Sequence, residues 1–207
     1  MNPITASNTA QIPILLGDLA FVRQGYHFRK KVTHDPLGNI SVVQSPDISQ
    51  FTTVIPDRLS KVNGDRIKTE YHLAPKSILV KSRGTNYSAA LFDLPGVTAV
   101  AAYHFIVVTV TSADLLPEFL LWFINRRDSQ DWLSARSRGS YVKAVSAKAL
   151  ADLPIIVPPM QQQHLIVKSG RLANQESIIS SEISAKRNLL TQTILESALA
   201  GPIRTEP

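Results

Sequence analysis

The end of the chain contains a proline-free segment that is too long for an ordinary loop. Pro158 and Pro159 are followed by 42 residues, from Met160 to Gly201, without another proline. Proline at the start of a helix and glycine just after its end are common boundaries, and Gly201 is followed by another proline. At a rise of 1.5 Å per residue, an unbroken helix of this length is about 60 Å long, roughly twice the diameter of a small domain. The sequence therefore predicts one long helix that extends past its own domain.

An apolar stripe follows one side of this predicted helix. Its members recur at steps of seven or four residues, which keeps them on one helical face. They are Leu165, Leu172, Ile179, Ile183, Leu190 and Ile194. Glu176 and Lys186 interrupt the stripe, so it is not a regular two-stranded zipper. Because a small domain cannot cover the whole stripe, we expect these residues to pack on a helix of another chain, as an intermolecular coiled coil.

The preceding residues have the pattern of a mixed α/β (α+β) domain. Short apolar runs predict strands over residues 40–43, 77–81 and 89–92, and a longer apolar run predicts a buried strand over residues 98–111. Pro117 begins a predicted helix, and a second helical piece follows around Trp132. We expect Trp122 and Trp132 to be core residues. The predicted division is a domain over residues 1–159, a helix over 160–201 and a tail over 202–207.

Positive charge is concentrated in this predicted domain. The chain carries a net charge of +6, and residues 1–159 hold 17 Lys and Arg against 12 Asp and Glu, whereas residues 160–207 hold 5 against 4. A basic surface attracts nucleic acid, because each neutralised phosphate releases counterions. Residues 133–151 contain no acidic side chain at all. The domain, and not the helix, is therefore the expected place for contact with double-stranded DNA.

Three basic segments, at residues 25–31, 81–87 and 136–143, are the candidate DNA contacts. Their candidate residues are Tyr26, His27, Arg29, Lys30 and Lys31 in the first, Lys81, Arg83, Asn86 and Tyr87 in the second, and Arg136, Arg138, Ser140, Tyr141 and Lys143 in the third. Arginine pairs well with guanine and asparagine with adenine, so Arg83 and Asn86 are expected to read bases and the lysines to contact phosphates. For each residue, an ordinary solvated surface charge is the alternative.

The motifs of common enzymes and metal sites do not occur in the sequence. There is no cysteine, and no two histidines stand three or four residues apart, so no metal site is expected. No phosphate-binding glycine loop, no serine-hydrolase elbow and no Asp-x-Lys or Glu-x-Lys pair is present. We expect no catalytic residue and no cofactor. No apolar run is long enough for a membrane span, and we expect a cytoplasmic protein.

Several segments resemble the DNA-specificity subunit of type I restriction-modification enzymes. The most specific is Gly139-Ser140 with Val142, followed by Pro158-Pro159 and then Gln163 one turn into the long helix. Weaker likenesses are Leu16-Gly17-Asp18-Leu19, Leu73 to Val80 followed by Arg83-Gly84, and Pro117-Glu118-Phe119-Leu120. The resemblance implies a target-recognition domain with no catalytic site of its own. It also implies two partners, a DNA methyltransferase (modification) subunit and a restriction subunit.

The size of the chain corresponds to half of such a subunit. A full specificity subunit has two recognition domains and two long helices, which separate the two halves of a split DNA site. This sequence has one of each and no internal repeat, so it resembles a half-subunit that works as a homodimer and reads a symmetric, interrupted site. One alternative is an interaction module or regulator that binds methyltransferase or restriction subunits without reading DNA. An enzyme with an unrecognised site is a third possibility.

Overall fold

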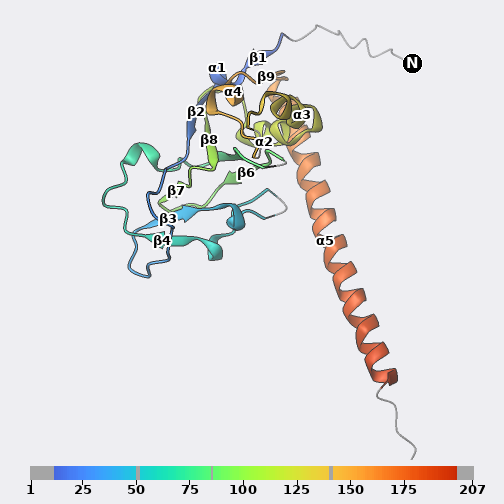
Figure 1. Ribbon diagram of the computed structural model, residues 1–207. Helices are drawn as coiled ribbons and strands as arrows, with labels where there is room; N and C mark the ends of the chain where they lie inside the picture. Colours follow the sequence, from blue (N-terminus) through green and yellow to red (C-terminus); the bar gives the residue numbers. More distant parts are fainter. Residues whose placement is uncertain (1–11, 50–51, 85, 140–141, 200–207) are drawn as a thin grey trace, which may run out of the picture. The chain divides into compact units, whose positions relative to one another are not determined.

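The computed structural model describes residues 12–49, 52–84, 86–139 and 142–199. The chain divides into two units, Met1–Val167 and Lys168–Pro207, and each is described by itself. The first unit contains the sheets and most of the helices, and the second continues the last helix (Figure 1).

A four-stranded antiparallel sheet lies at the centre of the first unit. Its strands, in their order across the sheet, are β2 (Ala20–Gln24), β8 (Phe105–Val110), β5 (Ser77–Lys81) and β6 (Ala89–Phe92). Successive side chains point to opposite faces of a strand, and both faces of this sheet are buried. In β8, Ile106 and Val108 join one apolar cluster, whereas Phe105 and Val107 join another. This arrangement explains why β8 is apolar from Phe105 to Val108 rather than alternating.

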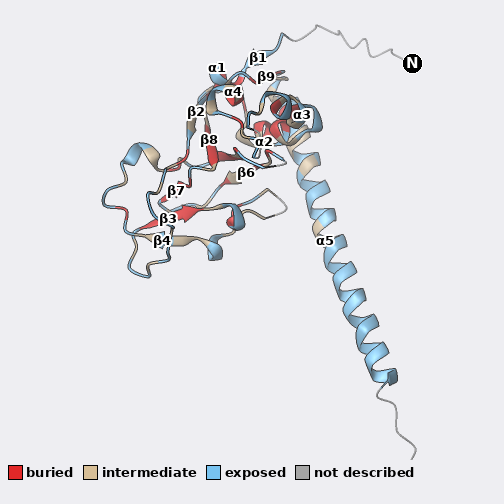
Figure 2. Ribbon diagram, in the orientation of Figure 1, coloured by how far each residue is buried: buried red, intermediate tan, exposed pale blue. Residues whose placement is uncertain are grey.

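A three-stranded sheet packs on one of these faces. It consists of β4 (Ser60–Val62), β3 (Ile40–Val43) and β7 (Ala99–Ala101), with β3 antiparallel to β4 and parallel to β7. The apolar cluster between the two sheets is centred on Phe92 and Phe105. Figure 2 shows β3 in the colour of buried residues, whereas β4 is intermediate to exposed.

Helices cover the other face of the four-stranded sheet. They are α2 (Pro117–Asn125), α3 (Arg127–Arg136) and α4 (Ala147–Ala151), and they share one apolar cluster with strands β5 and β8. Pro117 stands in the first turn of α2, where its missing N–H costs nothing. The extended backbone of Arg126 separates α2 from α3. Phe119, Leu120 and Ile124 bury the inner side of α2.

Shorter elements complete the unit. They are β1 (Ile14–Leu15), which pairs with β9 (Pro154–Ile155), the one-turn helix α1 (Leu16–Leu19), and three 3₁₀ turns at Ser45–Asp47, Pro56–Arg58 and Thr69–Tyr71. The β1–β9 pair brings residues near the two ends of the domain sequence together.

The three short strands predicted over residues 40–43, 77–81 and 89–92 are confirmed as β3, β5 and β6. The single strand predicted over residues 98–111 is wrong in its continuity, because this run forms both β7 and β8. The chain turns at residues 102–104 and passes from the three-stranded sheet to the four-stranded one. Both strands are buried, so the apolar run alone did not reveal the turn between them.

The long helix α5 (Met160–Leu199) begins at the residue predicted from the double proline. The expected stop at Gly201 and the tail lie outside the described residues. Its first two turns belong to the first unit, which ends at Val167 and not at Pro159. Gln163 explains this attachment, because its side chain is fully buried. It accepts a hydrogen bond from the Leu116 N–H (2.9 Å) and donates to the carbonyls of Asp114 (2.7 Å) and Pro158 (2.9 Å).

Candidate nucleic-acid interface

The 81–87 segment connects β5 to β6, and its far end is fixed by two side-chain amides from the helices. Gln130 accepts from the Tyr87 N–H (2.9 Å) and donates to the Tyr87 carbonyl (3.2 Å). Asn125 forms the same pair with Ala89, at 2.8 and 3.1 Å. An amide side chain can satisfy both polar groups of one backbone residue in this way. The exposed part of the segment is therefore displayed from a fixed frame.

Tyr87 itself is not available for DNA contact, so this part of the sequence prediction is wrong. Its side chain is only 2% exposed and belongs to the apolar cluster between the sheet and the helices. The Tyr87 ring does not project from the polar loop to solvent. It packs in the apolar cluster and holds the loop in place. Arg83 and Asn86, the two predicted base readers, are exposed, and Lys81 is half-buried.

The 136–143 segment lies beside the 81–87 segment, although about fifty residues separate them in sequence. Two backbone hydrogen bonds join them, one from the Gly84 N–H to the Lys143 carbonyl (3.3 Å) and one from the Val145 N–H to the Ser82 carbonyl (2.9 Å). Two of the three predicted basic segments thus meet at one edge of the unit.

A narrow turn shapes the 136–143 segment. Arg138 and Ala144 exchange two backbone hydrogen bonds, at 2.9 and 2.8 Å, and close a loop around Gly139. Gly139 has a φ of +124°, and a Cβ at this position would lie 2.3 Å from the Val142 carbonyl oxygen. A side chain is therefore excluded there. The candidate contacts Ser140 and Tyr141 lie outside the described residues.

The 25–31 segment is fixed at its first two residues. The Tyr26 N–H donates to the Ala101 carbonyl (2.7 Å), and the Tyr26 ring is half-buried against Phe28 and Tyr71, with centroid separations of 4.8 and 5.1 Å. Tyr26 therefore contributes mainly to packing. His27 is exposed and points to a different neighbour.

That neighbour is Tyr103, which is not among the DNA contacts predicted from the sequence. The rings of His27 and Tyr103 meet edge to face with centroids 5.1 Å apart. The Arg83 guanidinium lies 5.1 Å from the centre of the Tyr103 ring, and its Nη1 is 3.5 Å from the tyrosine hydroxyl. Tyr103 thus links the first basic segment to the second. The only sequence signal was a polar and aromatic pair, Tyr103-His104, within an otherwise apolar run.

His104 lies behind this group and is half-buried. Its Nε2 accepts a hydrogen bond from the Ser45 N–H (3.1 Å), so the ring is neutral in this arrangement. Burial lowers the pKa of His104 below the ordinary value of 6.5, and the positive charges of Arg83 and Lys81 lower it further. The smaller, coulombic part of this pKa shift comes from Arg83 and Lys81, two cations of the 81–87 segment.

The remaining basic candidates are exposed. They are Arg29, Lys30, Lys31, Arg136, Arg138 and Lys143. Within the described part of the chain, ion pairs occur at Lys68–Glu70, Lys76–Glu118, Arg126–Asp128 and Arg127–Asp131, and none involves a residue of the three basic segments.

Arg136 stacks on Trp132, with its guanidinium carbon 3.7 Å from the ring centre. Trp132 also packs against the core, as expected, whereas Trp122 is 37% exposed and carries Arg126 at 5.2 Å.

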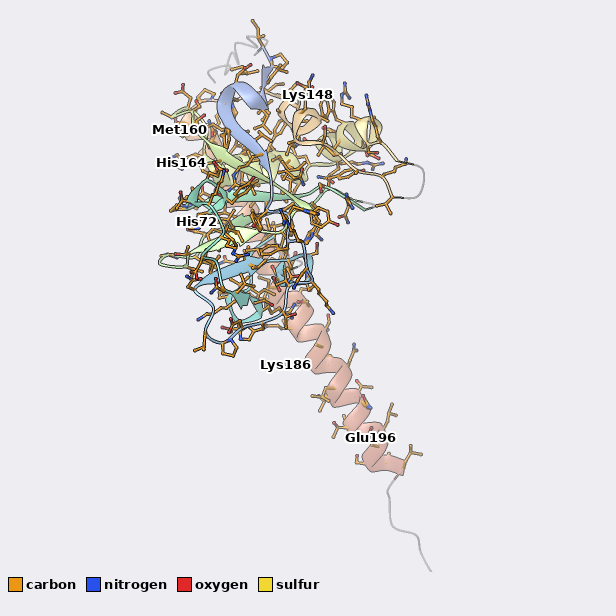
Figure 3. All side chains as sticks on the ribbon, turned by 60° about the vertical axis from the view of Figure 1, so that its left-hand side comes forward. His72, Lys148, Met160, His164, Lys186 and Glu196 are labelled. Atoms are coloured by element: carbon orange, nitrogen blue, oxygen red, sulfur yellow. The ribbon has the colours of Figure 1, made fainter. Side chains whose placement is uncertain are left out.

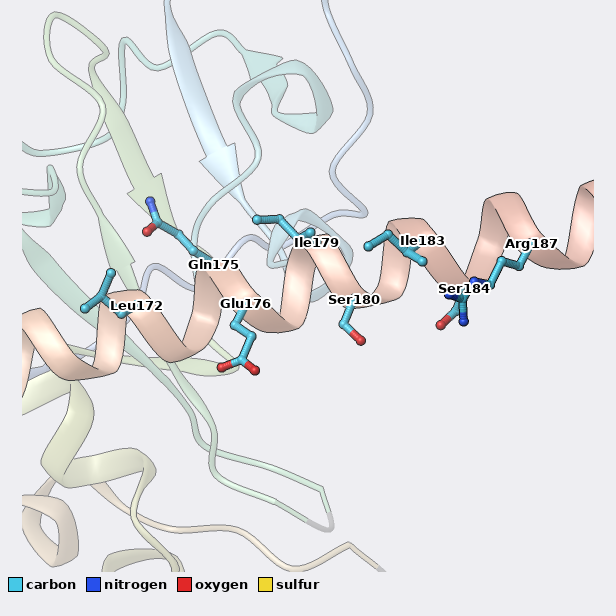
Figure 4. Close-up of a pocket in the computed structure, with 8 residues that line it drawn as sticks. All are labelled: Leu172, Gln175, Glu176, Ile179, Ser180, Ile183, Ser184 and Arg187. Atoms are coloured by element: carbon cyan, nitrogen blue, oxygen red, sulfur yellow. The ribbon is translucent and has the colours of Figure 1, made fainter.

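Within the second unit, the apolar residues of the predicted stripe on α5 are exposed. Leu172, Ile179 and Ile183 line a shallow groove along the helix, together with Glu176 and Arg187 (Figure 4). Leu190 and Ile194, further along, are 61% and 56% exposed. Figure 3 shows the polar side chains of Lys186 and Glu196 on the same helix. A single helix cannot bury its own face, so this apolar surface has no cover within the second unit. Leu165, the first member of the stripe, stands on the part of α5 that belongs to the first unit, and it is also exposed.

Two kinds of feature are missing among the described residues. No group of three or more His, Asp or Glu side chains is placed to hold a metal ion. In the same part of the chain, no helix is both long and apolar enough to cross a membrane.

Comparison with known protein families identifies one family that matches most of the chain. Residues 13–169 match the family described as "Type I restriction modification DNA specificity domain". No curated protein matches the sequence.

Three solved structures are similar in fold. A chain from work on the "complex assembly and conformational transition of the type I R-M system" matches with a TM-score of 0.68 and 17% identity, over 95% of this chain and 48% of that one. The HsdS subunit from Thermoanaerobacter tengcongensis matches with a TM-score of 0.61 and 16% identity, over 96% and 47%. The type I restriction-modification S subunit from M. genitalium matches with a TM-score of 0.55 and 14% identity, over 93% and 47%. The chain therefore spans about half the length of the solved chains that it matches.

Proposed function

The chain belongs to the family of type I restriction-modification DNA specificity domains, and from that premise we propose that it is a non-catalytic, cytoplasmic subunit that recognises double-stranded DNA. In this proposal, it directs a methyltransferase subunit and a restriction subunit to one half of a split site. Recognition takes place at the edge formed by the 25–31, 81–87 and 136–143 segments.

The observation that carries the proposal is the meeting of these three segments. Backbone hydrogen bonds connect the second to the third, and Tyr103 connects the second to the first. The basic side chains that they display are exposed, and no carboxylate of the described residues pairs with them. Exposed and uncompensated cations on a fixed frame suit contact with a phosphate backbone.

Within this edge, we assign different roles to different residues. The exposed cations Arg29, Lys30, Lys31, Arg136, Arg138 and Lys143 are proposed to contact phosphates, and such contacts position a protein on DNA without reading its sequence. Arg83 and Asn86 are proposed to read bases, because their side chains can form two hydrogen bonds with guanine and adenine in the major groove.

The long helix is proposed to supply the spacing and the partners. Two copies that pair along the Leu172–Ile194 stripe place two recognition domains around a two-fold axis, as a symmetric interrupted site requires. The same pairing covers the apolar side chains that a single chain leaves exposed. Methyltransferase chains then dock on the paired helices.

The direct test is DNA binding over a salt series. Fluorescence anisotropy with mixed-sequence duplexes, with and without a methyltransferase partner, is expected to give an affinity that falls steeply as salt rises, with a slope of about −0.9 per phosphate contacted. Binding that is absent, or independent of salt, in both conditions contradicts the proposal.

A triple variant separates DNA recognition from a purely regulatory role. Arg136→Ala, Arg138→Ala and Lys143→Ala together are expected to lower the affinity for DNA by on the order of 100-fold at moderate salt, because three phosphate contacts are lost. Binding to the methyltransferase chain is expected to be unchanged. As a matched control, Lys68→Ala, Arg126→Ala and Arg127→Ala remove three charges that are paired with carboxylates outside the proposed edge. Equal losses in the two triple variants count against the assigned surface.

A further inference from the structure

Tyr103 occupies the turn between β7 and β8, and its position is fixed from two sides. The next carbonyl, that of His104, accepts hydrogen bonds from the Ser82 N–H and from the Ser82 Oγ, both at 2.8 Å. The Gln24 amide donates to the Tyr103 carbonyl. The backbone of the turn is thus tied to β2 and to the strand exit at Ser82, so the ring projects from a rigid base.

The ring is not part of the core. Tyr103 is 37% exposed, and the residues around its ring are Arg83 and His27, which are themselves exposed, and His104. A tyrosine that only filled space would be expected inside one of the apolar clusters, as Tyr87 is. This ring instead joins two polar segments of the proposed DNA-binding edge.

The contact with Arg83 restricts the guanidinium without using up its donors. Arg83 lies 5.1 Å from the ring centre, and Nη1 is 3.5 Å from the hydroxyl, a long and weak hydrogen bond. A guanidinium carries five N–H donors in a planar fork, and the contact with the Tyr103 hydroxyl uses one of them. Because its rotamers are already limited, such an arginine loses less conformational freedom when it binds a planar acceptor pair.

We infer that Tyr103 is a positioning residue for base recognition, which holds Arg83 in place to bind the O6 and N7 edge of a guanine in the major groove. The edge-to-face contact with His27 helps to fix the Tyr103 ring. This inference rests on the proposed function, because it assigns a role within the same DNA-binding edge. Arginine to guanine is the pairing that the fork geometry favours. The sequence preference at one position of each half-site then depends on a tyrosine that need not touch the base.

The test is selection from a duplex library with a randomised centre, performed with the full-length chain. The variants are Arg83→Lys, which keeps the charge and loses the fork, Tyr103→Leu, which loses the ring, and Tyr103→Phe, which loses only the hydroxyl. Lys30→Ala is the control for loss of a charge elsewhere on the edge. Thermal unfolding of each variant is measured in parallel.

The wild-type chain is expected to enrich guanine at one position of each half-site. Arg83→Lys is expected to lower this preference by on the order of 10- to 100-fold. Tyr103→Leu is expected to lower it about 5-fold at the same position, because the ring that restrains Arg83 is lost. The salt dependence is expected to stay unchanged, because no charge is removed. Tyr103→Phe keeps the ring and is expected to keep most of the preference. Lys30→Ala is expected to weaken binding to all sequences and to reduce the salt slope by about one.

Two results overturn the inference and leave the proposed function standing. One is an unchanged guanine preference in Arg83→Lys. The other is a uniform loss at all positions in both Tyr103 variants, accompanied by a lower unfolding temperature, which would make the tyrosine a structural residue only. A wild-type chain that binds duplexes but enriches no sequence, or that binds none, contradicts the proposed function itself, and this inference with it.

Discussion

The proposed DNA-binding edge and the terminal helix differ in how their side chains are supported. At the edge, charged residues stand on segments tied to one another by backbone hydrogen bonds and by the Tyr103 ring. Along α5 beyond Val167, apolar residues stand on a single helix and are about half exposed or more, as at Ile183 (46%) and Leu189 (66%). The first surface is organised within the first unit, whereas the second is exposed on its helix and is proposed to be covered by another chain. Each region can be disturbed separately, and the two are expected to respond differently.

The largest effect is expected on the helix. Ile179→Asp together with Ile183→Asp places charges in the groove of Figure 4. In the proposed dimer, these carboxylates are buried without partners, and the dissociation constant is expected to rise at least 1000-fold, or about 4 kcal/mol. Sedimentation velocity over a concentration series measures the shift.

The matched control carries the same charge on the opposite side of the helix. Asn174 lies about 200° around the helix from Leu172, and Ser181 lies about 200° from Ile179. The control variant, Asn174→Asp with Ser181→Asp, is expected to leave the dimer intact. The midpoint of unfolding of the first unit should not move in either variant. A wild-type chain that is monomeric at micromolar concentration removes the basis of this prediction and of the proposed homodimer.

A smaller effect is expected where α5 joins the first unit. Gln163→Leu leaves the Leu116 N–H and the carbonyls of Asp114 and Pro158 without their buried partner. The free energy of unfolding is expected to fall by about 3 kcal/mol. Urea unfolding followed by tryptophan fluorescence reports this change, since both tryptophans lie in the first unit. Gln162→Leu, at the exposed neighbouring position, is the control, and equal losses in the two variants would show that Gln163 is not the anchor.

The smallest effect is expected in the pH dependence of stability, through His104 at the proposed DNA-binding edge. The pKa of His104 is lowered in the folded chain, mainly by burial, so below about pH 6.5 the unfolded chain binds a proton more readily than the folded one. The free energy of unfolding is therefore expected to fall as the pH falls from 6.5 through the folded-state pKa. His104→Gln, which cannot titrate, is expected to flatten this part of the stability curve. Arg83→Gln is expected to raise the pKa of His104, measurable by NMR titration, because a neighbouring positive charge is removed. An unchanged curve in His104→Gln would show that other groups dominate.

The sequence predicted features that depend on near neighbours in the chain. The start of α5 at Met160 follows from Pro158 and Pro159, and the strands over residues 40–43, 77–81 and 89–92 follow from short apolar runs. The stripe on α5 follows from helical periodicity alone. The mixed α/β fold with a long C-terminal helix is confirmed, whereas the pairing of that helix with another chain stays a prediction.

Features that depend on distant residues were missed. The turn at residues 102–104 was hidden because strands β7 and β8 are both buried, and Tyr103 was missed with it. Tyr87 was misassigned because its burial depends on Gln130, 43 residues away, and on the packing of the helices over the sheet. The approach of the 81–87 and 136–143 segments is likewise a product of tertiary structure. The composition of the sequence located the basic segments. It did not show which of their residues are buried and hold the segment in place, and which are exposed to solvent.

The hydrogen bonds of the Asn125 and Gln130 amides affect which substitutions the 81–87 segment can tolerate. All four of their hydrogen bonds to Ala89 and Tyr87 use main-chain groups, so they do not depend on which side chains occupy the outward positions of the loop. Arg83 and Asn86 can therefore be exchanged for other residues while the scaffold beneath them keeps its shape. Under the proposed function, single substitutions at these two positions would give new target preferences with little risk to folding.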